Sequence, residues 1–298
     1  MVELHQGYPL ARLTTVRTGG EAELFAAPGT IDELRELLVW ASAHGHEVSV
    51  VGSGSNLLVA DQGVPGLVLH LEAELARIEA VAGGLRCGGG ARMPKAAART
   101  AALGLAGLEF AVNIPGTVGG SVRMNANAYD GALATVLRWV EVVSAEGVSR
   151  RAPEELGFEY RGSALAPGEV VAAAQFALSS AAPDAVRATL AEMRALRHAV
   201  QPRGIKTFGS TFKNPPGETA GKLLAAAGAG GLRVGGARLS PKHANFVENV
   251  DGASTADIVA LMAQARGRVL AHSGIALERE VQALGPVNFP WEGTSIAG

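Results

Sequence analysis

Cysteine is scarce in this 298-residue sequence, which contains Cys87 and no other. A single cysteine cannot form a disulfide within one chain, so a disulfide-stabilised secreted fold is excluded and a reducing compartment is favoured. No apolar run approaches the roughly 20 residues that a membrane-spanning helix needs. The first residues, MVELHQGYPLARL, also lack the basic start and apolar run of a signal peptide. We therefore expect a cytoplasmic protein without a membrane partner.

An excess of charge of one sign is also missing. The 26 basic and 28 acidic residues leave a net charge of −2. Because the basic residues are spread along the chain, they form no positive stretch of the kind that binds nucleic acid. A chain of this length can bury a large core, and it predicts two or three domains or one large one.

Glycine, in contrast, is abundant, and it gathers between Gly107 and Asp130 in the stretch GLEFAVNIPGTVGGSVRMNANAYD. Glu109 and Arg123 are the only charges before Tyr129, and neither a helical nor a strand period is visible. An ordinary loop is one interpretation. The low charge favours another, because glycine lets main-chain N–H groups approach a large, partly anionic ligand closely. The stretch therefore indicates a nucleotide cofactor.

The region before this stretch predicts a helix, a strand and a glycine turn. Thr30 and Glu33 form a capping-box pattern that begins a helix over 30–45, and a strand follows at 48–51. The turn GSGSN comes next, but it lacks the third glycine of the Rossmann dinucleotide-binding motif, and the following NLLVAD favours a strand or turn over a helix. A simple tight turn remains an alternative for this GxG.

The rest of the chain alternates between strand and helix patterns, which is typical of α/β or α+β folds. Strands are expected at 66–71, 136–143, 147–151, 170–178, 244–250 and around 275–284. Helices are expected at 94–105, at 184–197 with Asp184 as its cap, at 219–227, and from a Ser254 cap to Ala271. The break QPRG at 201–204 predicts a domain boundary.

Seven motifs, in order along the chain, resemble those of the UDP-N-acetylenolpyruvoylglucosamine reductase family. They are TVRTGG (15–20), VGSGSNLLV (51–59), GLEFAVNIPGTVGGSVRMNANAY (107–129), FEYRGS (158–163), GSTFKNP (209–215), GARLSPKHANFVEN (236–249) and LEREV (277–281). The resemblance implies an α+β (mixed α/β) fold, with a two-part FAD-binding domain of the vanillyl-alcohol-oxidase/PCMH type and a C-terminal α+β substrate-binding domain. It places the FAD-binding subdomains at 1–65, joined by the tail 285–298, and at 66–200, and the substrate-binding domain at 201–284.

The resemblance also implies a reaction of bacterial cell-wall (peptidoglycan) synthesis, with roles in cell shape and cell division. FAD is the bound cofactor, NADPH the co-substrate, and an enolpyruvyl ether of UDP-N-acetylglucosamine the substrate that is reduced to UDP-N-acetylmuramate. We expect a monomer with this UDP-sugar as its partner. Non-covalent FAD is expected because no histidine or cysteine lies in the implied FAD loops, although Cys87 just precedes Gly88–Gly90.

The resemblance assigns roles to particular residues. Two loops would hold FAD: Gly52, Ser53, Gly54, Ser55, Asn56 and Leu57, and Ile114, Pro115, Gly116, Thr117, Gly119 and Gly120. Arg161 matches the arginine that stabilises the substrate carboxylate, Ser210 matches the proton donor, and Glu280 matches the catalytic glutamate. Lys213 or water would compensate charge beside Ser210. The expected substrate-binding residues are Tyr129, Tyr160, Lys213 and Asn214.

The sequence departs from one form of the family, which closes over its substrate with a tyrosine-bearing loop. No tyrosine follows Arg161, and the gap between Phe176 and Asp184 is short, so the chain resembles the shorter subtype. Four basic residues are alternatives for contact with the UDP diphosphate: Lys206, Lys213, Arg203 and Lys222. No metal site is expected, because His44 and His46 have no cysteine or carboxylate cluster nearby. The competing hypotheses are an FAD-linked small-alcohol oxidase of the same cofactor-binding fold and a catalytically silent nucleotide-binding module.

Overall fold

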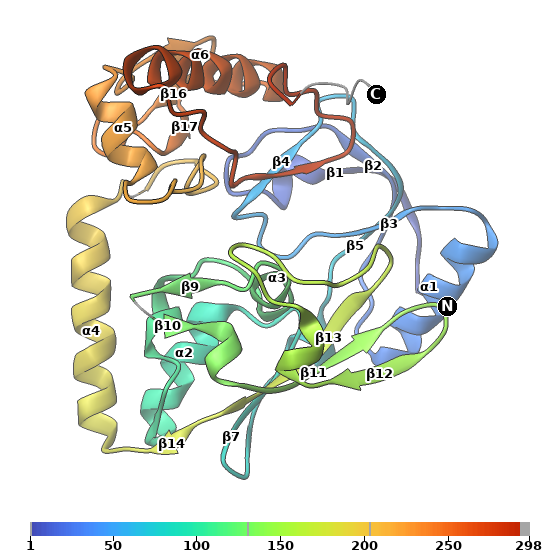
Figure 1. Cartoon of the computed structure of the whole chain (residues 1–298). Helices are drawn as coiled ribbons and strands as arrows, with labels where there is room; N and C mark the ends of the chain where they lie inside the picture. The colour runs from blue at the N-terminus through green and yellow to red at the C-terminus, as the bar shows by residue number, and fades with distance from the viewer. Residues whose placement is uncertain (1, 130, 203, 293–298) are drawn as a thin grey trace. The chain divides into compact units, whose positions relative to one another are not determined.

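The computed structural model describes residues 2–129, 131–202 and 204–292 (Figure 1). The chain divides into two compact units. Unit 1 takes in the described residues of Met1–Gly7, Glu23–Ser53 and Pro65–Ala199, and unit 2 those of Tyr8–Ala22, Gly54–Val64 and Val200–Gly298. Each unit therefore combines segments that are distant in the sequence.

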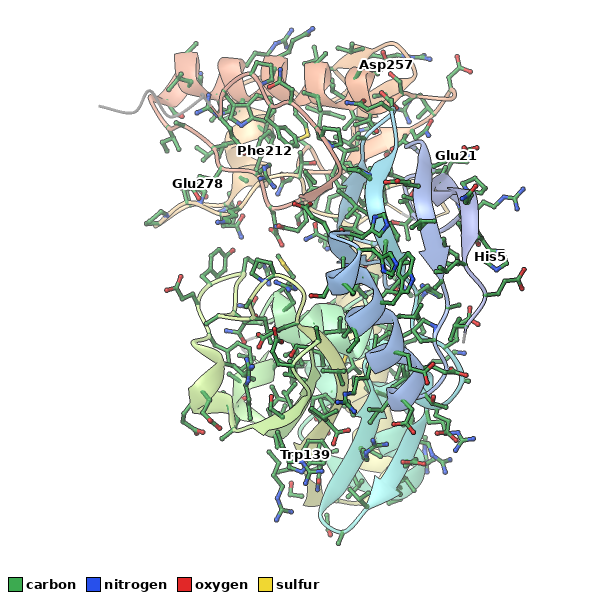
Figure 2. The ribbon with its side chains drawn as sticks, turned by 90° about the vertical axis from the view of Figure 1, so that its right-hand side faces the viewer. His5, Glu21, Trp139, Phe212, Asp257 and Glu278 are labelled. Carbon is green, nitrogen blue, oxygen red and sulfur yellow. The ribbon has the colours of Figure 1, made fainter. Side chains whose placement is uncertain are left out.

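Unit 1 is built on a five-stranded antiparallel sheet with the order β12-β11-β13-β7-β6. Its strands are β6 (Ile78–Val81), β7 (Gly84–Gly88), β11 (Leu137–Val143), β12 (Val148–Arg151) and β13 (Val170–Ala177), and Figure 1 shows β11, β12 and β13 side by side. The central strand β13 is almost wholly buried because its sequence, VVAAAQFA, is apolar on both faces. At the surface the guanidinium carbon of Arg150 lies 4.0 Å from the ring centre of Trp139, which Figure 2 labels.

Three helices complete this part of unit 1. They are α2 (Met93–Leu103), α3 (Val118–Arg123) and α4 (Pro183–Val200). The small side chains of α2, among them Ala96 and Ala97, are fully buried and share one apolar core with Leu85, Phe176 and Val186. The core thus unites the helices with the inner face of the sheet.

A second sheet has the order β1-β2-β5-β3, with strands β1 (His5–Pro9), β2 (Glu21–Ala26), β3 (Val48–Val50) and β5 (Val64–Leu69). In unit 1, β3 runs parallel to β5. Helix α1 (Ile31–Ala43) begins at Thr30, whose side chain accepts from the Glu33 N–H while Glu33 accepts from the Thr30 N–H. Its apolar stripe, which includes Leu34 and Leu38, packs with Leu67 of β5. The expected capping box and helix are confirmed.

Unit 2 has its own core, around helices α5 (Ala220–Ala226) and α6 (Thr255–Ser273). Strands β15 (Arg233–Val234), β16 (Ala237–Leu239) and β17 (Val247–Asn249) form an antiparallel sheet, and β4 (Leu57–Val59) pairs in parallel with β18 (Gln282–Leu284). The Asp61 carboxylate, just after β4, accepts the N–H groups of Thr255 and Ala256 at 2.8 and 2.9 Å. These contacts satisfy two of the helix-terminal donors and join α6 to the β4 segment.

The remaining elements are short. They are strands β8 (Leu105–Ala106), β9 (Asn127–Ala128), β10 (Gly131–Ala132) and β14 (Ser179–Ser180), and 3₁₀ helices η1 (Leu10–Arg12), η2 (Ala73–Ala76), η3 (Glu109–Asn113), η4 (Leu133–Thr135) and η5 (Pro153–Leu156). Among the described residues, none of the helices combines the length and apolar character needed to cross a bilayer.

Several sequence predictions are wrong in detail. The strand expected around 275–284 is limited to β18, and the one expected at 244–250 is limited to β17. Asp184 lies inside the first turn of α4 and is not its cap, and Leu196 of this helix is 54% exposed, so the buried face ends earlier than its apolar period suggests. The short strands β6, β7 and β16 were not expected, because glycines and charges interrupt their alternation.

Candidate active site

The two glycine-rich loops meet within unit 1 at Gly52 and Thr117. A Cβ atom added to Gly52 would lie 2.4 Å from the Thr117 Oγ1, so only glycine fits. Thr117 is the N-cap of α3 and accepts from the Gly120 N–H at 3.4 Å. The stretch IPGTVGG is therefore not an open loop, because its second half begins helix α3. The absence of a side chain at Gly52 leaves the space that the Thr117 side chain fills.

A third glycine segment, Gly88–Gly90, supports this arrangement. The N–H of Gly119 donates to the Gly89 carbonyl at 2.7 Å, and the N–H of Val118 donates to the Ala91 carbonyl at 2.8 Å. A Cβ on Gly89 would lie 1.8 Å from the Val171 carbonyl oxygen of β13. Sequence reasoning noted these glycines only because of the adjacent Cys87, but the run of three was a signal for close backbone packing.

This part of unit 1 fits an uncharged cradle for a nucleotide cofactor. The hydroxyl oxygens of Ser53 and Ser121 are buried and have no hydrogen-bond partner among the described residues. Buried hydroxyls are costly without partners, and a bound ligand with polar groups would supply them. Ser53 belongs to the first loop expected to hold FAD, and Ser121 directly follows Gly120, the last residue of the second.

Cys87 does not fit a covalent link to a cofactor. It is fully buried in β7, and desolvation raises the pKa of its thiol to about 12, against a smaller lowering effect of Arg86. Because the thiolate is the reactive form, this cysteine is inert at neutral pH.

The second half of the GSGSN turn lies in unit 2, where the TVRTGG motif holds it. Gly54 has a φ of +57°, and a Cβ there would lie 2.1 Å from the Leu13 carbonyl oxygen. Its own carbonyl accepts from both the N–H and the hydroxyl of Thr15, each at 3.1 Å. The motif that sequence analysis left without a role thus fixes the position of Gly54.

Unit 2 also links Asn56, the segment that contains Ser210, and Glu280 through hydrogen bonds. The Glu280 N–H donates to the carbonyl of Thr211, the residue after Ser210, at 2.8 Å. The Asn56 side chain donates to the Glu280 carbonyl at 3.2 Å, and Ser210 itself is half-buried. A cofactor-loop residue and the two expected catalytic residues therefore belong to one hydrogen-bonded assembly.

Lys213 and Asn214 each contact another part of unit 2. The Lys213 ammonium lies 3.3 Å from the Glu278 carboxylate, so its positive charge is paired with Glu278 and not directed only at Ser210. Asn214 is exposed, and its side-chain oxygen accepts from the Ala220 N–H at the start of α5. Figure 2 shows Phe212 among the side chains of unit 2 and Glu278 at the edge of that unit.

Arg161 lies in unit 1, in a tight turn closed by a bridge between Glu159 and Gly162. It has a φ of +62°, an uncommon conformation for arginine that marks local strain. Its guanidinium donates to the Asn127 side-chain oxygen at 2.9 Å and lies 5.3 Å from the ring centre of Tyr160. Tyr160 is half exposed. The cation is therefore oriented before any ligand arrives.

Tyr129 is tied to α4 in unit 1. Its hydroxyl donates to the Met193 carbonyl at 3.0 Å and accepts from the Asn113 side chain at 2.9 Å, while Arg197 donates to the Asn113 carbonyl. Burial lowers the pKa of Arg197, partly offset by Tyr129. Sequence analysis missed Asn113 and Arg197, which give Tyr129 a structural role in addition to any contact with substrate.

The basic residues considered for the diphosphate differ in their surroundings. Lys222 pairs with Glu218, Lys206 is exposed, and Arg203 lies outside the described residues. No group of three or more potential metal ligands occurs in the part of the chain that is described. His44 stacks on Trp40 with ring centres 4.6 Å apart, and His243 packs edge-on to Phe246.

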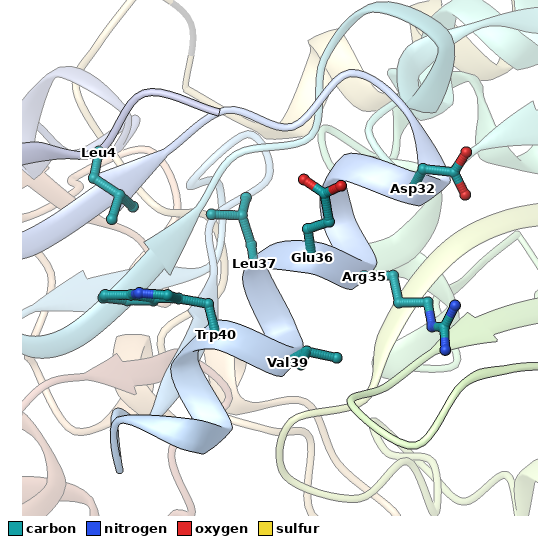
Figure 3. Close-up of a pocket in the computed structure, with 7 residues that line it drawn as sticks. All are labelled: Leu4, Asp32, Arg35, Glu36, Leu37, Val39 and Trp40. Atoms are coloured by element: carbon teal, nitrogen blue, oxygen red, sulfur yellow. The ribbon is translucent and has the colours of Figure 1, made fainter. Parts of the chain in front are cut away.

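A surface cavity of about 740 Å³ lies along the outer face of α1 (Figure 3). Its lining is formed by Leu4, Asp32, Arg35, Glu36, Leu37, Val39 and Trp40. None of these residues belongs to the glycine loops or to the expected catalytic set, so the candidate site is elsewhere.

Comparison with known proteins gives a consistent result. The model for the C-terminal domain of UDP-N-acetylenolpyruvoylglucosamine reductase matches residues 201–284, and that for an FAD binding domain matches residues 22–152. UDP-N-acetylenolpyruvoylglucosamine reductase of Anaeromyxobacter dehalogenans (strain 2CP-C) is 44% identical over 95% of this chain and 85% of its own length. The protein of that name from Rhizorhabdus wittichii is 45% identical over 95% and 92%.

A solved structure agrees. That of UDP-N-acetylenolpyruvylglucosamine reductase (MurB) from Thermus caldophilus has a TM-score of 0.83 and 35% sequence identity, and the match covers 95% of this chain and 99% of that one. The expected fold, an FAD-binding domain followed by a C-terminal domain with mixed helix and strand content, is confirmed.

The fit at Gly52 gives a testable prediction. Gly52→Ala should weaken FAD binding at least about tenfold, because the new Cβ would force the loop away from Thr117. A tenfold change in the dissociation constant corresponds to about 1.4 kcal/mol of binding free energy. The ratio of flavin to protein absorbance after purification, and FAD titration of the apoprotein, would measure this. Gly267→Ala is the control, since that exposed helical glycine has no neighbour within 4 Å. Unchanged FAD affinity in Gly52→Ala would contradict the assignment of this loop to FAD binding.

Proposed function

The chain belongs to the UDP-N-acetylenolpyruvoylglucosamine reductase family, and from this premise we propose how its residues carry out the reaction. It is an FAD-dependent oxidoreductase that uses NADPH to reduce the enolpyruvyl ether of UDP-N-acetylglucosamine to UDP-N-acetylmuramate. The observation that carries this conclusion is the identity of 44% over 95% of the chain, which includes both the cofactor and the C-terminal domain. The small-alcohol oxidase alternative has no comparable support.

The reaction determines what the protein must stabilise. FAD, once reduced by NADPH, would supply the hydride that adds to the terminal carbon of the enolpyruvyl group. Negative charge then develops on the neighbouring carbon and spreads into the carboxylate. The chain's own residues must therefore bind the growing carboxylate charge and deliver one proton to that carbon.

Arg161 is the residue we assign to the carboxylate. Its guanidinium is always charged and presents a planar fork that matches two carboxylate oxygens. The hydrogen bond to Asn127 and the adjacent Tyr160 ring support this role, because they orient the fork without neutralising it. A pre-oriented donor need not be reorganised when charge develops.

Ser210 is the residue we assign to the proton, and Glu280 orients the carboxylate or a water beside it. A serine hydroxyl is a weak acid, so it must be held close to the carbon that receives the proton. The hydrogen bond from the Glu280 N–H to the Thr211 carbonyl supports the assignment of Ser210 and Glu280 to one site, because it joins the main-chain segments that carry them. Tyr129, Tyr160, Lys213 and Asn214 remain proposals for contacts with the nucleotide sugar.

The cofactor-binding residues and the domain boundaries are also proposed from membership of this family. We propose that Gly52–Leu57 and Ile114–Thr117, with Gly119 and Gly120, hold FAD, and that the chain comprises FAD-binding parts at 1–65 and 66–200 and a substrate-binding part at 201–284.

The product is a cell-wall precursor, which supports a role in peptidoglycan synthesis and, through it, in cell shape and cell division. We further propose that the enzyme is cytoplasmic, where NADPH and nucleotide sugars are available, and that it acts as a monomer.

The function is tested by following the flavin spectrum without oxygen. NADPH should bleach the bound flavin, and the UDP-linked enolpyruvyl ether should restore its colour, because each addition completes one half-reaction. Recovery of colour with oxygen but not with the ether would favour the oxidase alternative. A protein that cannot be reconstituted with FAD would refute the function altogether.

The proton-donor assignment predicts a selective defect. Ser210→Ala should be reduced by NADPH at the normal rate, while reoxidation by the enolpyruvyl ether slows by about 10²–10⁴-fold, because a positioned proton donor contributes that much. Stopped-flow absorbance separates the two half-reactions. Ser149→Ala, at an exposed strand position, is the matched control. Normal reoxidation of Ser210→Ala by substrate would rule out Ser210 as the donor.

The carboxylate assignment predicts that charge alone is insufficient at position 161. Arg161→Lys should lower the limiting rate of reoxidation by substrate about 10²–10³-fold, because lysine keeps the charge but loses the two-oxygen fork and the bond geometry to Asn127. Arg150→Lys, at an exposed surface ion pair, is the control. If Arg161→Lys retains the wild-type rate, the arginine provides no specific stabilisation of the developing charge.

A further inference from the structure

Asn245 makes an unusual set of contacts with the segment that carries Ser210. Its main-chain carbonyl accepts from the Thr211 N–H at 2.8 Å. Its side-chain oxygen accepts from the Phe212 N–H at 2.9 Å, and its side-chain nitrogen donates to the Phe212 carbonyl, also at 2.9 Å. Asn245 therefore makes three hydrogen bonds with the two residues that follow Ser210.

These contacts imitate a β-ladder. In an antiparallel pair, one residue donates to and accepts from the same opposite residue. Here the side-chain amide of Asn245 takes the place of a main-chain peptide opposite Phe212. The neighbouring residue, Phe246, forms an isolated antiparallel bridge with Ser210 itself. The main chains of the two segments pair only at Ser210 and Thr211. The Asn245 side-chain amide extends this pairing by one residue, to Phe212.

The other side of the same segment is also fixed. The Glu280 N–H donates to the Thr211 carbonyl, the Lys213 N–H donates to the Glu278 carbonyl, and Phe212 bridges Arg279. Residues 210–213 consequently lie between the Asn245 segment and the Glu280 segment. If the Asn245 side dissociates, the main chain of Ser210 loses its support on one edge while the Glu280 side remains.

The environment makes these bonds hard to replace. Asn245 is 3% exposed, and Thr211 and Phe212 are fully buried. Buried main-chain groups that lose a partner cannot turn to bulk water, so the segment must shift to find another. A shift of about 1 Å at a catalytic group can slow a reaction by about 10²-fold.

We propose that Asn245 is a positioning residue for the proton donor: its side-chain amide clamps the Thr211–Phe212 main chain and thereby sets the position of the Ser210 hydroxyl. This inference rests on the proposed role of Ser210. It assigns a purpose to the sequence KHANF, which the reaction otherwise leaves unexplained. Asn245 acts through Ser210 and does not itself contact the reacting atoms.

Two substitutions test the clamp in the FAD-loaded enzyme. Asn245→Ala removes both side-chain bonds, and Asn245→Asp keeps the shape but places an oxygen where the amide nitrogen faces the Phe212 carbonyl. Each should slow the limiting rate of flavin reoxidation by substrate about 10–100-fold, with little change in apparent substrate affinity or in reduction by NADPH. A purely structural role would lower thermal stability without this split between the half-reactions.

Thr255→Val is the matched control for lost stability. It removes a buried hydrogen bond in the same unit, from the Thr255 hydroxyl to the Val59 carbonyl, at 2.6 Å. It should lower the melting temperature while reoxidation by substrate, measured on folded enzyme, stays normal. If Thr255→Val slows reoxidation as much as the Asn245 variants do, the effect is general destabilisation and the clamp is refuted.

A double-substitution cycle separates this inference from the function on which it rests. When Ser210 is already alanine, adding Asn245→Ala should change the reoxidation rate less than about 3-fold, because residues that act through one another are not additive. Independent, multiplying effects would overturn the clamp while leaving the role of Ser210 intact. If Ser210→Ala alone has no effect, the proton-donor assignment fails first.

Discussion

The approach of one backbone to another without an intervening side chain is the constraint on which the rest of the structure depends. It recurs at Gly89 beside the Val171 carbonyl and at Gly54 beside the Leu13 carbonyl, and at Gly52 the missing side chain leaves space for the side chain of Thr117. Each contact leaves no space for a Cβ atom. The loops expected to hold FAD can therefore present N–H groups and hydroxyls instead of cations, and the cofactor-binding region needs little charge.

The proposed cofactor and catalytic residues are divided between the two units. Unit 1 supplies the uncharged cradle and the oriented guanidinium of Arg161, while unit 2 supplies the ladder that holds Ser210 and Glu280. In both units the side chains proposed to act in the reaction lie on short, irregular segments. These segments owe their order to hydrogen bonds with neighbours distant in sequence, and rigid strands such as β13 or long helices such as α6 provide the core beneath them.

The sequence predicted the elements whose signals are local. Helices α1 and α6 were located by capping residues, Thr30 and Ser254, that act within one turn. The residues proposed for the site were assigned by family resemblance and not by local patterns. In contrast, α3 was hidden because VGGSVR lacks helical periodicity, and Asn245 was missed because its partner, Phe212, is 33 residues away. Contacts of that kind depend on tertiary structure and leave no periodic trace in the chain.

Cys87 carries a consequence for attempts to inhibit the enzyme. Its thiol is buried against the apolar core of unit 1 and remains protonated at neutral pH. Electrophilic compounds that act by alkylating cysteine would therefore find no accessible sulfur nucleophile on this protein, and mild oxidants would meet no thiolate. Screening libraries built on such warheads would yield few genuine hits, so a useful ligand has to gain its affinity through shape and polar complementarity.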